Sequence, residues 1–192
     1  MTDPARHERS NDLRRAELDS GENSGDSGDE SQQTIRERVI RLAFGGDRKR
    51  YDEFVRELEE ATPAGVEVIL RGSAVTGHKW RSPDEPFDAD GPGTSDLDVT
   101  FVGGDMITLF REFHIPEIHS VPLSEAHPFA SPALGALRKR LCALTRRPVN
   151  LQATTSLVQF VRDFVMDQPY LVLLEKSEAE EVDDRASGAR DD

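Results

Sequence analysis

The sequence predicts a mixed α/β domain, in which helices flank a small mixed sheet and a disordered acidic tail lies at each end. Residues 1–33 hold nine acidic and four basic side chains, and residues 177–192 hold seven acidic and two basic ones. Segments of this composition cannot bury enough apolar surface to fold alone. Between them, short β-branched runs alternate with longer runs of helical periodicity. We therefore expect one folded domain over residues 34–176.

The charge distribution limits the kinds of partner. The chain has a net charge of −13 and each tail contributes −5, which leaves −3 for residues 34–176. A nearly balanced domain lacks the broad basic surface of a nucleic-acid groove. The single cysteine, Cys142, excludes an internal disulfide and a cysteine-based zinc cluster. With no signal-peptide apolar region and no run of about 18 apolar residues, we expect a cytoplasmic protein that does not contact membranes.

Two helices are expected first. Thr34 can cap a helix that continues to a glycine pair at 45–46, and Asp47 can cap a second helix that ends before Pro63. Each segment repeats apolar residues at helical spacing, which gives one buried face. These apolar positions are Ile35, Val39, Leu42 and Ala43 in the first helix and Tyr51, Phe54, Val55 and Leu58 in the second.

The periodicity then changes to that of strands. Residues 66–72, VEVILRG, are short and β-branched and predict a buried strand, whereas residues 73–77 leave room only for a turn of helix. Residues 81–95 contain three prolines and two glycines, which predicts a long irregular loop. In residues 96–102, polar and apolar side chains alternate, so this strand should have one polar and one apolar face.

The C-terminal half continues to alternate helices and strands. The expected elements are a helix over 106–113 capped by Asp105, an irregular stretch at 114–132, a helix at 133–147 and a strand at 148–154. Thr155 or Ser156 then opens a last helix, and residues 170–175 form either a strand or a helical turn.

Two short motifs carry the candidate chemistry. Asp96 and Asp98 are two positions apart in a strand, so their carboxylates lie on one face with Cβ atoms about 7 Å apart. Two carboxylates, together with waters and nucleotide phosphates, form a ligand set that Mg²⁺ prefers. Gly72 and Ser73 follow the preceding strand, where a glycine lets a phosphate approach the backbone and free N–H and hydroxyl groups donate to it. One motif predicts a metal site and the other a phosphate site.

RGSAVTG followed by SDLDVTFV resembles the signature of the nucleotidyltransferase superfamily related to DNA polymerase beta, over roughly residues 66–102. In that family one strand ends in Gly-Ser and the next begins with Asp-x-Asp. The resemblance implies that Gly72 and Ser73 hold the β and γ phosphates of a nucleoside triphosphate. It also implies that Asp96 and Asp98 bind two Mg²⁺ ions, or Mn²⁺, which activate an attacking hydroxyl and stabilise the pyrophosphate leaving group.

The sequence departs from the family pattern at two points. The connection between the motifs is long, because Ser73 and Asp96 are 23 positions apart. In addition, the later strand that carries a third carboxylate in the family offers Asn150 here. The amide oxygen of Asn150 can bind Mg²⁺, but the side chain is neutral and cannot act as a general base. Of the acids in the intervening loop, Asp90 is the best placed to supply a replacement.

Several basic residues lie near the motifs. Lys79 follows the Gly-Ser turn and is a candidate to reach a triphosphate, while Arg71 could pair with Asp96 or Asp98. A denser basic cluster is expected to be mainly an exposed helix face. It consists of Arg138, Lys139, Arg140, Arg146 and Arg147. Three histidines share one proline-containing stretch, but no fourth ligand is spaced to complete a metal site with them. They are His114, His119 and His127.

These features predict a metal-dependent enzyme that transfers a nucleoside monophosphate from a nucleoside triphosphate, such as ATP, to an acceptor hydroxyl and releases pyrophosphate. The chain has no room for the additional domains of polymerases, so the expected acceptor is a small molecule, a protein side chain or an RNA end. The alternative is a catalytically impaired nucleotide-binding or protein-binding module of the same fold, which Asn150 favours. A sugar transferase would account for the two acids but not for the Gly-Ser turn.

Overall fold

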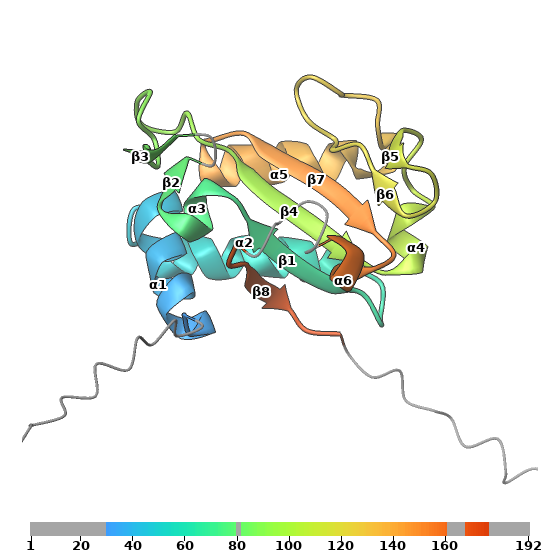
Figure 1. The fold of residues 1–192 in the computed structure, drawn as a ribbon, viewed down its shortest axis with the longest axis horizontal. Coiled ribbons are helices and arrows are strands. Elements are labelled where there is room, and N and C mark those ends of the chain that lie inside the picture. Colours follow the sequence, from blue (N-terminus) through green and yellow to red (C-terminus); the bar gives the residue numbers. More distant parts are fainter. Residues whose placement is uncertain (1–29, 80–81, 161–167, 177–192) are drawn as a thin grey trace, which may run out of the picture.

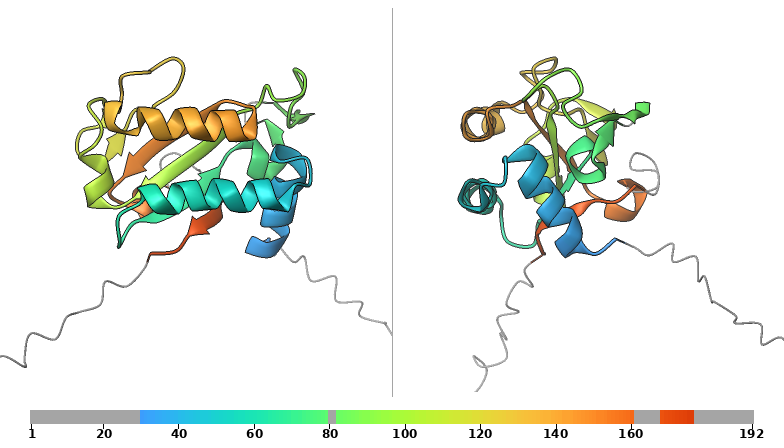
Figure 2. Two further views of the ribbon diagram at one scale, coloured as in Figure 1. Left: turned by 180° about the vertical axis from the view of Figure 1, so that it is seen from behind. Right: turned by 90° about the vertical axis from the view of Figure 1, so that its left-hand side faces the viewer.

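A six-stranded mixed sheet forms the centre of the computed structural model, which describes residues 30–79, 82–160 and 168–176. The strand order is β5-β6-β7-β4-β1-β8, with β4 and β7 parallel and the other neighbours antiparallel. Helices α2 (Arg48–Ala61) and α5 (Gly135–Thr145) lie side by side across one face of this sheet (Figures 1 and 2). The fold is therefore mixed α/β. The N-terminal tail was predicted over 1–33, but residues 30–33 belong to the fold, because Gln32 begins α1 and Glu30 pairs with Arg38. Residues 1–29 and the predicted C-terminal tail, 177–192, lie outside the described residues.

Three central strands position the polar residues of interest. They are β1 (Glu67–Arg71), β4 (Leu97–Val102) and β7 (Val149–Thr154). The predicted alternation in β4 is confirmed, because Leu97, Val99 and Phe101 are 0% exposed and belong to the core that α2 and α5 cover. The polar residues between them, Asp98 and Thr100, face the side of the sheet opposite to α2 and α5, where Thr100 is buried and Asp98 is partly exposed.

The two N-terminal helices form as predicted, with one difference in the capping residue. Helix α1 spans Gln32–Ala43, and its cap is Ser31, whose hydroxyl accepts a hydrogen bond from the backbone N–H of Thr34 at 3.2 Å. The predicted cap, Thr34, instead lies in the first turn. Helix α2 begins after Asp47, which accepts from the N–H of Arg50 at 3.1 Å, as expected for an N-cap.

The C-terminal segment is a strand rather than a helical turn. Strand β8 (Leu171–Leu174) pairs with β1 and lies at the edge of the sheet. The side-chain amide of Gln32 completes its outer edge by donating to the carbonyl of Tyr170 at 2.9 Å and accepting from the N–H of Val172 at 2.7 Å. A side chain from α1 thus satisfies edge groups that would otherwise be open to another strand.

Two segments predicted to be irregular contain short strands. In the 81–95 region, β3 (Ser82–Pro86) pairs with β2 (His78–Lys79) in a separate two-stranded hairpin. Proline is compatible with such an edge strand, since only one side needs backbone donors. Within 114–132, β5 (Phe113–Ile115) and β6 (His119–Ser120) extend the main sheet. Strands β2, β5 and β6 have only two or three residues and are too short to show a hydrophobic period, and the two prolines of β3 argue against a strand in the sequence.

The helix predicted over 106–113 is wrong in length and in its cap. Helix α4 covers only Gly104–Ile107, and Asp105 lies inside its first turn without capping it. The chain leaves the helix because the N–H of Arg111 bonds to the carbonyl of Ala130 at 2.8 Å, a contact distant in sequence that outweighs local propensity.

The remaining two predicted helices are confirmed in part. The helix expected at 133–147 forms as a 3₁₀ turn, η1 (Pro132–Leu134), followed by α5, which ends at Arg146 with φ 58°. Helix α6 (Leu157–Phe160) begins the last predicted helix, whose continuation at 161–167 lies outside the described residues. None of the helices in the described ranges has the length and apolar character needed to cross a membrane.

Candidate functional site

The Gly-Ser turn follows β1 and leads into α3 (Ser73–Thr76). Gly72 has φ 84° and ψ −160°, a conformation that side-chain-bearing residues rarely adopt. A Cβ atom at this position would also lie 2.9 Å from Oδ2 of Asp98. Glycine is therefore required twice, for the backbone turn and for the close approach of the Asp98 carboxylate. The turn and the Asp-x-Asp motif, although separated by a long loop, face each other.

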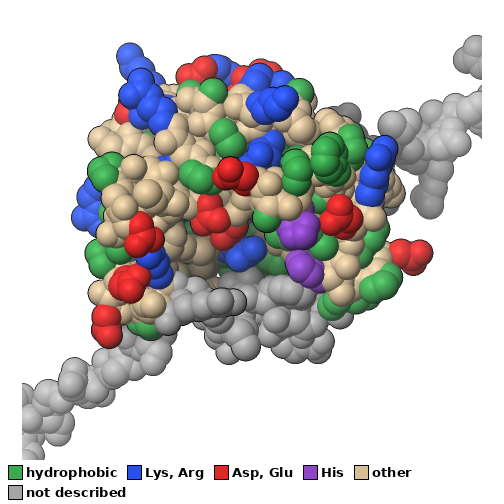
Figure 3. All heavy atoms as spheres, turned by 90° about the horizontal axis from the view of Figure 1, so that it is seen from above, with side chains coloured by type: hydrophobic (Ala, Val, Ile, Leu, Met, Phe, Trp, Pro, Cys, Tyr) green, Lys and Arg blue, Asp and Glu red, His purple; other side chains and the backbone are tan. Residues whose placement is uncertain are grey.

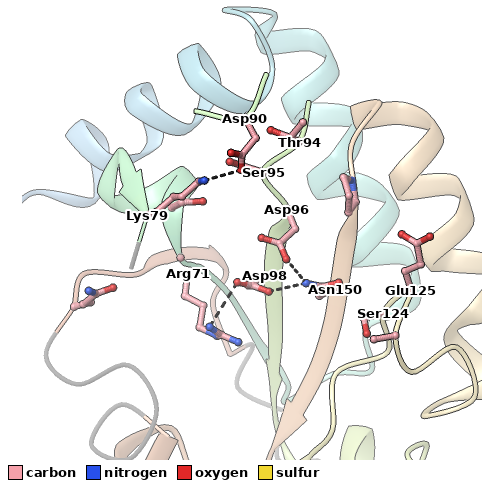
Figure 4. Close-up of a pocket in the computed structure, with 15 residues that line it drawn as sticks. Arg71, Lys79, Asp90, Thr94, Ser95, Asp96, Asp98, Ser124, Glu125 and Asn150 are labelled. Carbon is pink, nitrogen blue, oxygen red and sulfur yellow. Dashed lines mark hydrogen bonds and ion pairs between the residues drawn. The ribbon is translucent and has the colours of Figure 1, made fainter. Parts of the chain in front are cut away.

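Asn150 links the two aspartates. In the register of the sheet, Asp98 pairs with Asn150 on the parallel strand β7, while Asp96 immediately precedes β4. The amide nitrogen of Asn150 donates to Oδ2 of Asp96 at 2.6 Å and to Oδ1 of Asp98 at 3.0 Å (Figure 4). The structure thus brings together all three residues predicted to bind metal.

The electrostatics of the pair favour a cation. Burial, followed by the negative charge of Asp98, raises the pKa of Asp96, and this outweighs the opposing effects of the hydrogen bond from Asn150 and the charge of Arg71. A carboxyl group whose pKa is raised in this way is destabilised in its ionised form. A divalent cation between the two carboxylates would relieve both the loss of solvation and the mutual repulsion.

Arg71 supplies the positive charge beside the pair. It pairs with Asp98 across β1 and β4, and its Nη1 lies 3.6 Å from Oδ2 of Asp98. Its Nη2 donates to Oε1 of Gln152 at 3.2 Å, and its guanidinium carbon lies 5.6 Å from the centre of the Phe160 ring. The expectation that Arg71 pairs with one of the two aspartates is confirmed.

These residues line one open cavity of about 810 Å³. This volume is within the range of small-ligand pockets and is ample for a nucleotide. Seen from above, acidic side chains lie near the centre of this face, and Lys and Arg side chains lie at several places around them (Figure 3). The lining residues include Arg71, Gly72, Ser73, Lys79, Asp90, Asp96, Asp98 and Asn150.

Lys79 reaches the cavity, but its charge is already compensated. Its Nζ lies 2.6 Å from Oδ2 of Asp90 and 2.9 Å from Oε2 of Glu85. The hydrogen bond with Asp90 and then that with Glu85 raise the pKa of Lys79. Asp90 therefore serves the β2–β3 hairpin rather than replacing a third carboxylate at the aspartate pair. Among the residues that the structure describes, no group of three or more His, Cys, Asp and Glu side chains is arranged to hold a metal ion.

An ion pair holds the long loop in place immediately before Asp96. Arg147, which lies just before β7, donates to both carboxylate oxygens of Asp88 at 3.0 and 3.2 Å and to the carbonyl of Ser95 at 2.9 Å. Asp88 in turn accepts from the backbone N–H groups of Gly93 and Ser95 at 3.0 and 2.9 Å. The loop is thereby fastened to β7, and Asp96 is held next to Asn150.

The remaining candidates have structural roles. In the basic cluster, Arg138 donates to the carbonyl of Val149 at 2.7 Å and Arg140 pairs with Glu57 at 2.7 Å. Of the three histidines, His119 is buried against Phe160 at a ring separation of 4.8 Å, His127 lies 3.3 Å from Glu112, and His114 is exposed. The structure assigns no shared site to them.

Sequence reasoning missed one wall of the cavity. Ser124, Glu125 and Ala126 line it from the loop after β6, and Thr94 and Ser95 line it from the loop before β4. Only Ser95 belongs to a quoted motif, and the 124–126 segment reaches the site because β6 and then Leu123 pair with β7. Their position depends on tertiary pairing that the sequence pattern does not encode.

Comparisons of the chain with protein-family models, with curated proteins and with solved structures found no match. Function is therefore inferred from the motif and from the geometry of the cavity.

Replacing Gly72 by alanine should weaken the fold more than replacing Gly65 by alanine. Both glycines have positive φ, 84° and 79°, so alanine carries a backbone cost of at least about 1 kcal/mol at each, and the ψ of −160° at Gly72 adds to the cost there. Nothing lies within 4 Å of a Cβ at residue 65, whereas at residue 72 the Cβ meets Asp98. We expect an additional loss of about 1 kcal/mol in Gly72→Ala, because Asp98 must move away from Asn150. Urea unfolding measures both losses, and equal values would contradict the packing described.

The Asp88–Arg147 pair predicts a pH-dependent contribution to stability. Burial alone would raise the pKa of Asp88. The hydrogen bonds from Arg147, Gly93 and Ser95 outweigh burial and lower this pKa below its usual 3.8. A carboxyl group with a lowered folded-state pKa stabilises the fold above its unfolded value and loses this contribution as the pH falls through the folded value. Asp88→Asn should therefore reduce the free energy of unfolding by about 2 kcal/mol at pH 7.

The difference between native protein and Asp88→Asn should shrink only below about pH 4. Asparagine tolerates the positive φ of residue 88, 58°, so the substitution adds no backbone strain. Urea titrations at pH 7 and pH 3 measure this difference. Equal stability of the two proteins at pH 7 would show that the pair does not hold the loop.

Proposed function

We propose that this protein is a metal-dependent nucleotidyltransferase, which transfers a nucleoside monophosphate from a nucleoside triphosphate to an acceptor hydroxyl and releases pyrophosphate. The observation that supports the proposal is the closeness of Asp98 to Gly72, because the aspartate pair and the Gly-Ser turn then line one cavity together. If Asp96 and Asp98 were only two acids on a solvent-exposed sheet face, Asp98 would not need to lie so close to the backbone of Gly72.

The residues present fit a magnesium or manganese site. Asp96 and Asp98 would supply carboxylate oxygens. The amide nitrogen of Asn150 donates to both of them, so the side-chain amide would have to rotate for its oxygen to serve as the proposed third, neutral ligand. When bound, the divalent cation supplies Lewis-acid activation of the acceptor oxygen and charge stabilisation of the leaving group. Gly72 and Ser73 bind the terminal phosphates through the backbone and hydroxyl donors of the turn.

In the proposed reaction, the acceptor oxygen forms a bond to the α-phosphorus while the bond from that phosphorus to the bridging oxygen of the β-phosphate breaks. Pyrophosphate leaves with the bonding electron pair. The proton of the acceptor hydroxyl passes to solvent, to which the cavity is open. Asn150 cannot accept a proton and therefore only holds the two carboxylates in place.

We propose a small molecule, a protein side chain or an RNA end as the acceptor, and the cytoplasm as the site of action. The basic cluster supports this choice over a long nucleic acid, since Arg138, Arg140 and Arg147 are engaged in bonds within the protein. A continuous groove along a polynucleotide needs basic side chains that are free to contact phosphates.

A second candidate is a nucleotide-binding or protein-binding module of the same fold without turnover. The observation that favours it is the neutral Asn150 at the place where the family carries a third carboxylate, with its amide hydrogens directed at both aspartates. A site with two acids should hold the cation more weakly than a site with three.

The test is pyrophosphate release by the full chain with ATP, GTP, CTP or UTP and Mg²⁺ or Mn²⁺, in the presence of total RNA or a metabolite extract. We expect release with at least one nucleotide and a loss of at least about 100-fold in Asp98→Asn. Release that is unchanged in Asp98→Asn, or no release with any nucleotide, would contradict the enzymatic proposal. Nucleotide binding without release, with activity gained in Asn150→Asp, would support the impaired module instead.

The variant Asp96→Asn tests whether a loss of pyrophosphate release can occur without a loss of folding. Because burial and Asp98 disfavour the ionised Asp96, a neutral side chain of the same shape should leave the protein as stable as the native form or raise its melting temperature by roughly 2–4 °C. Differential scanning calorimetry measures this change. A variant that loses pyrophosphate release while keeping its stability separates loss of function from loss of fold.

A further inference from the structure

Arg71, Asp98 and Asn150 form one row across three adjacent strands. Arg71 on β1 is opposite Asp98 on β4, and Asp98 is opposite Asn150 on β7. The side chain of Arg71 is 24% exposed and lines the same cavity as the aspartate pair. A positive charge is thus built into the sheet beside the predicted metal ligands, directly before the glycine of the phosphate-binding turn.

The contact between Arg71 and Asp98 is loose. The separation of 3.6 Å is longer than the 2.7–2.9 Å typical of charge-assisted hydrogen bonds. One further bond, to Gln152 at 3.2 Å, and the Phe160 ring hold the guanidinium, and its Nε is buried without a hydrogen-bond partner in the described part of the chain. The guanidinium is therefore held near the carboxylates, and among the described residues part of its donor capacity is not used.

The charges of the site explain why such a contact is useful. Asp96 and Asp98 bring two negative charges and Arg71 one positive charge, which leaves one negative charge uncompensated. A divalent cation at the pair reverses the sign of the site and repels the guanidinium, since charges a few ångströms apart in a partly buried cavity interact strongly. Phosphate oxygens at the turn are then the best partners for Arg71. Lys79 is less suited to this role, because it is already paired with Glu85 and Asp90.

We propose that Arg71 is an internal counter-ion of the aspartate pair, which a divalent cation displaces and which the nucleotide's phosphates then bind. This inference rests on the proposed function and adds a role for Arg71 in it. Arg71 opposes binding of the cation alone and favours binding of the cation together with nucleotide. The site is thereby biased to take up metal as a metal–nucleotide complex.

The experiment uses the full chain with Mn²⁺ as the probe, followed by electron paramagnetic resonance of the free ion. The acidic chain also attracts Mn²⁺ at places other than the aspartate pair. Binding at the pair is therefore defined as the component of Mn²⁺ binding that Asp98→Asn abolishes. Arg71→Gln should tighten this component by about tenfold and weaken binding of α,β-methylene nucleoside triphosphates with Mn²⁺ by about tenfold. Arg71→Lys keeps the charge and should bind Mn²⁺ as the native protein does.

Arg140→Gln is the matched control. It removes one positive charge from the outer face of α5, where Arg140 pairs with Glu57, and should change neither affinity. If Arg71→Gln does not fold, Arg71→Met keeps the apolar stem beside Phe160 and gives the same comparison.

The outcomes separate the two proposals. Opposite changes in the affinities for Mn²⁺ and for nucleotide support the counter-ion role, since damage to the fold would weaken both. If the native protein binds both probes but Arg71→Gln binds Mn²⁺ no more tightly, the counter-ion role is wrong and the nucleotidyltransferase proposal stands. If the native protein binds neither probe, the proposed function is wrong and the counter-ion role is wrong with it.

Discussion

The approach of the Asp98 carboxylate to the backbone of Gly72 sets the geometry of the cavity. A side chain at residue 72 would place its Cβ 2.9 Å from Oδ2 of Asp98, so the carboxylate could keep its present position only beside a glycine. The antiparallel pairing of β1 and β4 brings the end of one strand to the start of the other, and the close approach then follows from the register. Every role assigned to the cavity depends on this contact.

Two further constraints keep the carboxylates in position. The parallel pairing of β4 with β7 puts Asn150 beside Asp98, where its amide nitrogen bonds to both aspartates. The Asp88–Arg147 ion pair fastens the long loop to the start of β7, immediately before Asp96. The loop between the motifs is therefore a supporting element of the site, and its length does not separate the two halves in space.

The central strands and most helices could be predicted because their signals are local. Strand β4 shows apolar and polar alternation over six residues, and α2 has both a capping aspartate and an apolar face. The short strands β3, β5 and β6 show no apolar alternation that could predict them, since β3 contains two prolines and β5 and β6 have only three and two residues. The predicted helix after Asp105 is too long for a different reason, because the bond between Arg111 and Ala130, which are distant in sequence, redirects the chain.

For the site, the sequence indicated which residue types belong together but not how they are bonded. Arg71 could be suggested as a partner of either aspartate, and only the strand register selects Asp98. Asp90 was the best candidate for a third carboxylate, yet its bond to Lys79 commits it to the hairpin. The most direct test of the central claim is a crystal structure with Mn²⁺ and an α,β-methylene nucleoside triphosphate, with Mn²⁺ located by anomalous scattering. The account predicts a Mn²⁺ peak about 2.0–2.3 Å from oxygens of Asp96 and Asp98, with the phosphates over Gly72 and Ser73. Nucleotide bound elsewhere, with no Mn²⁺ at the aspartate pair, would contradict it.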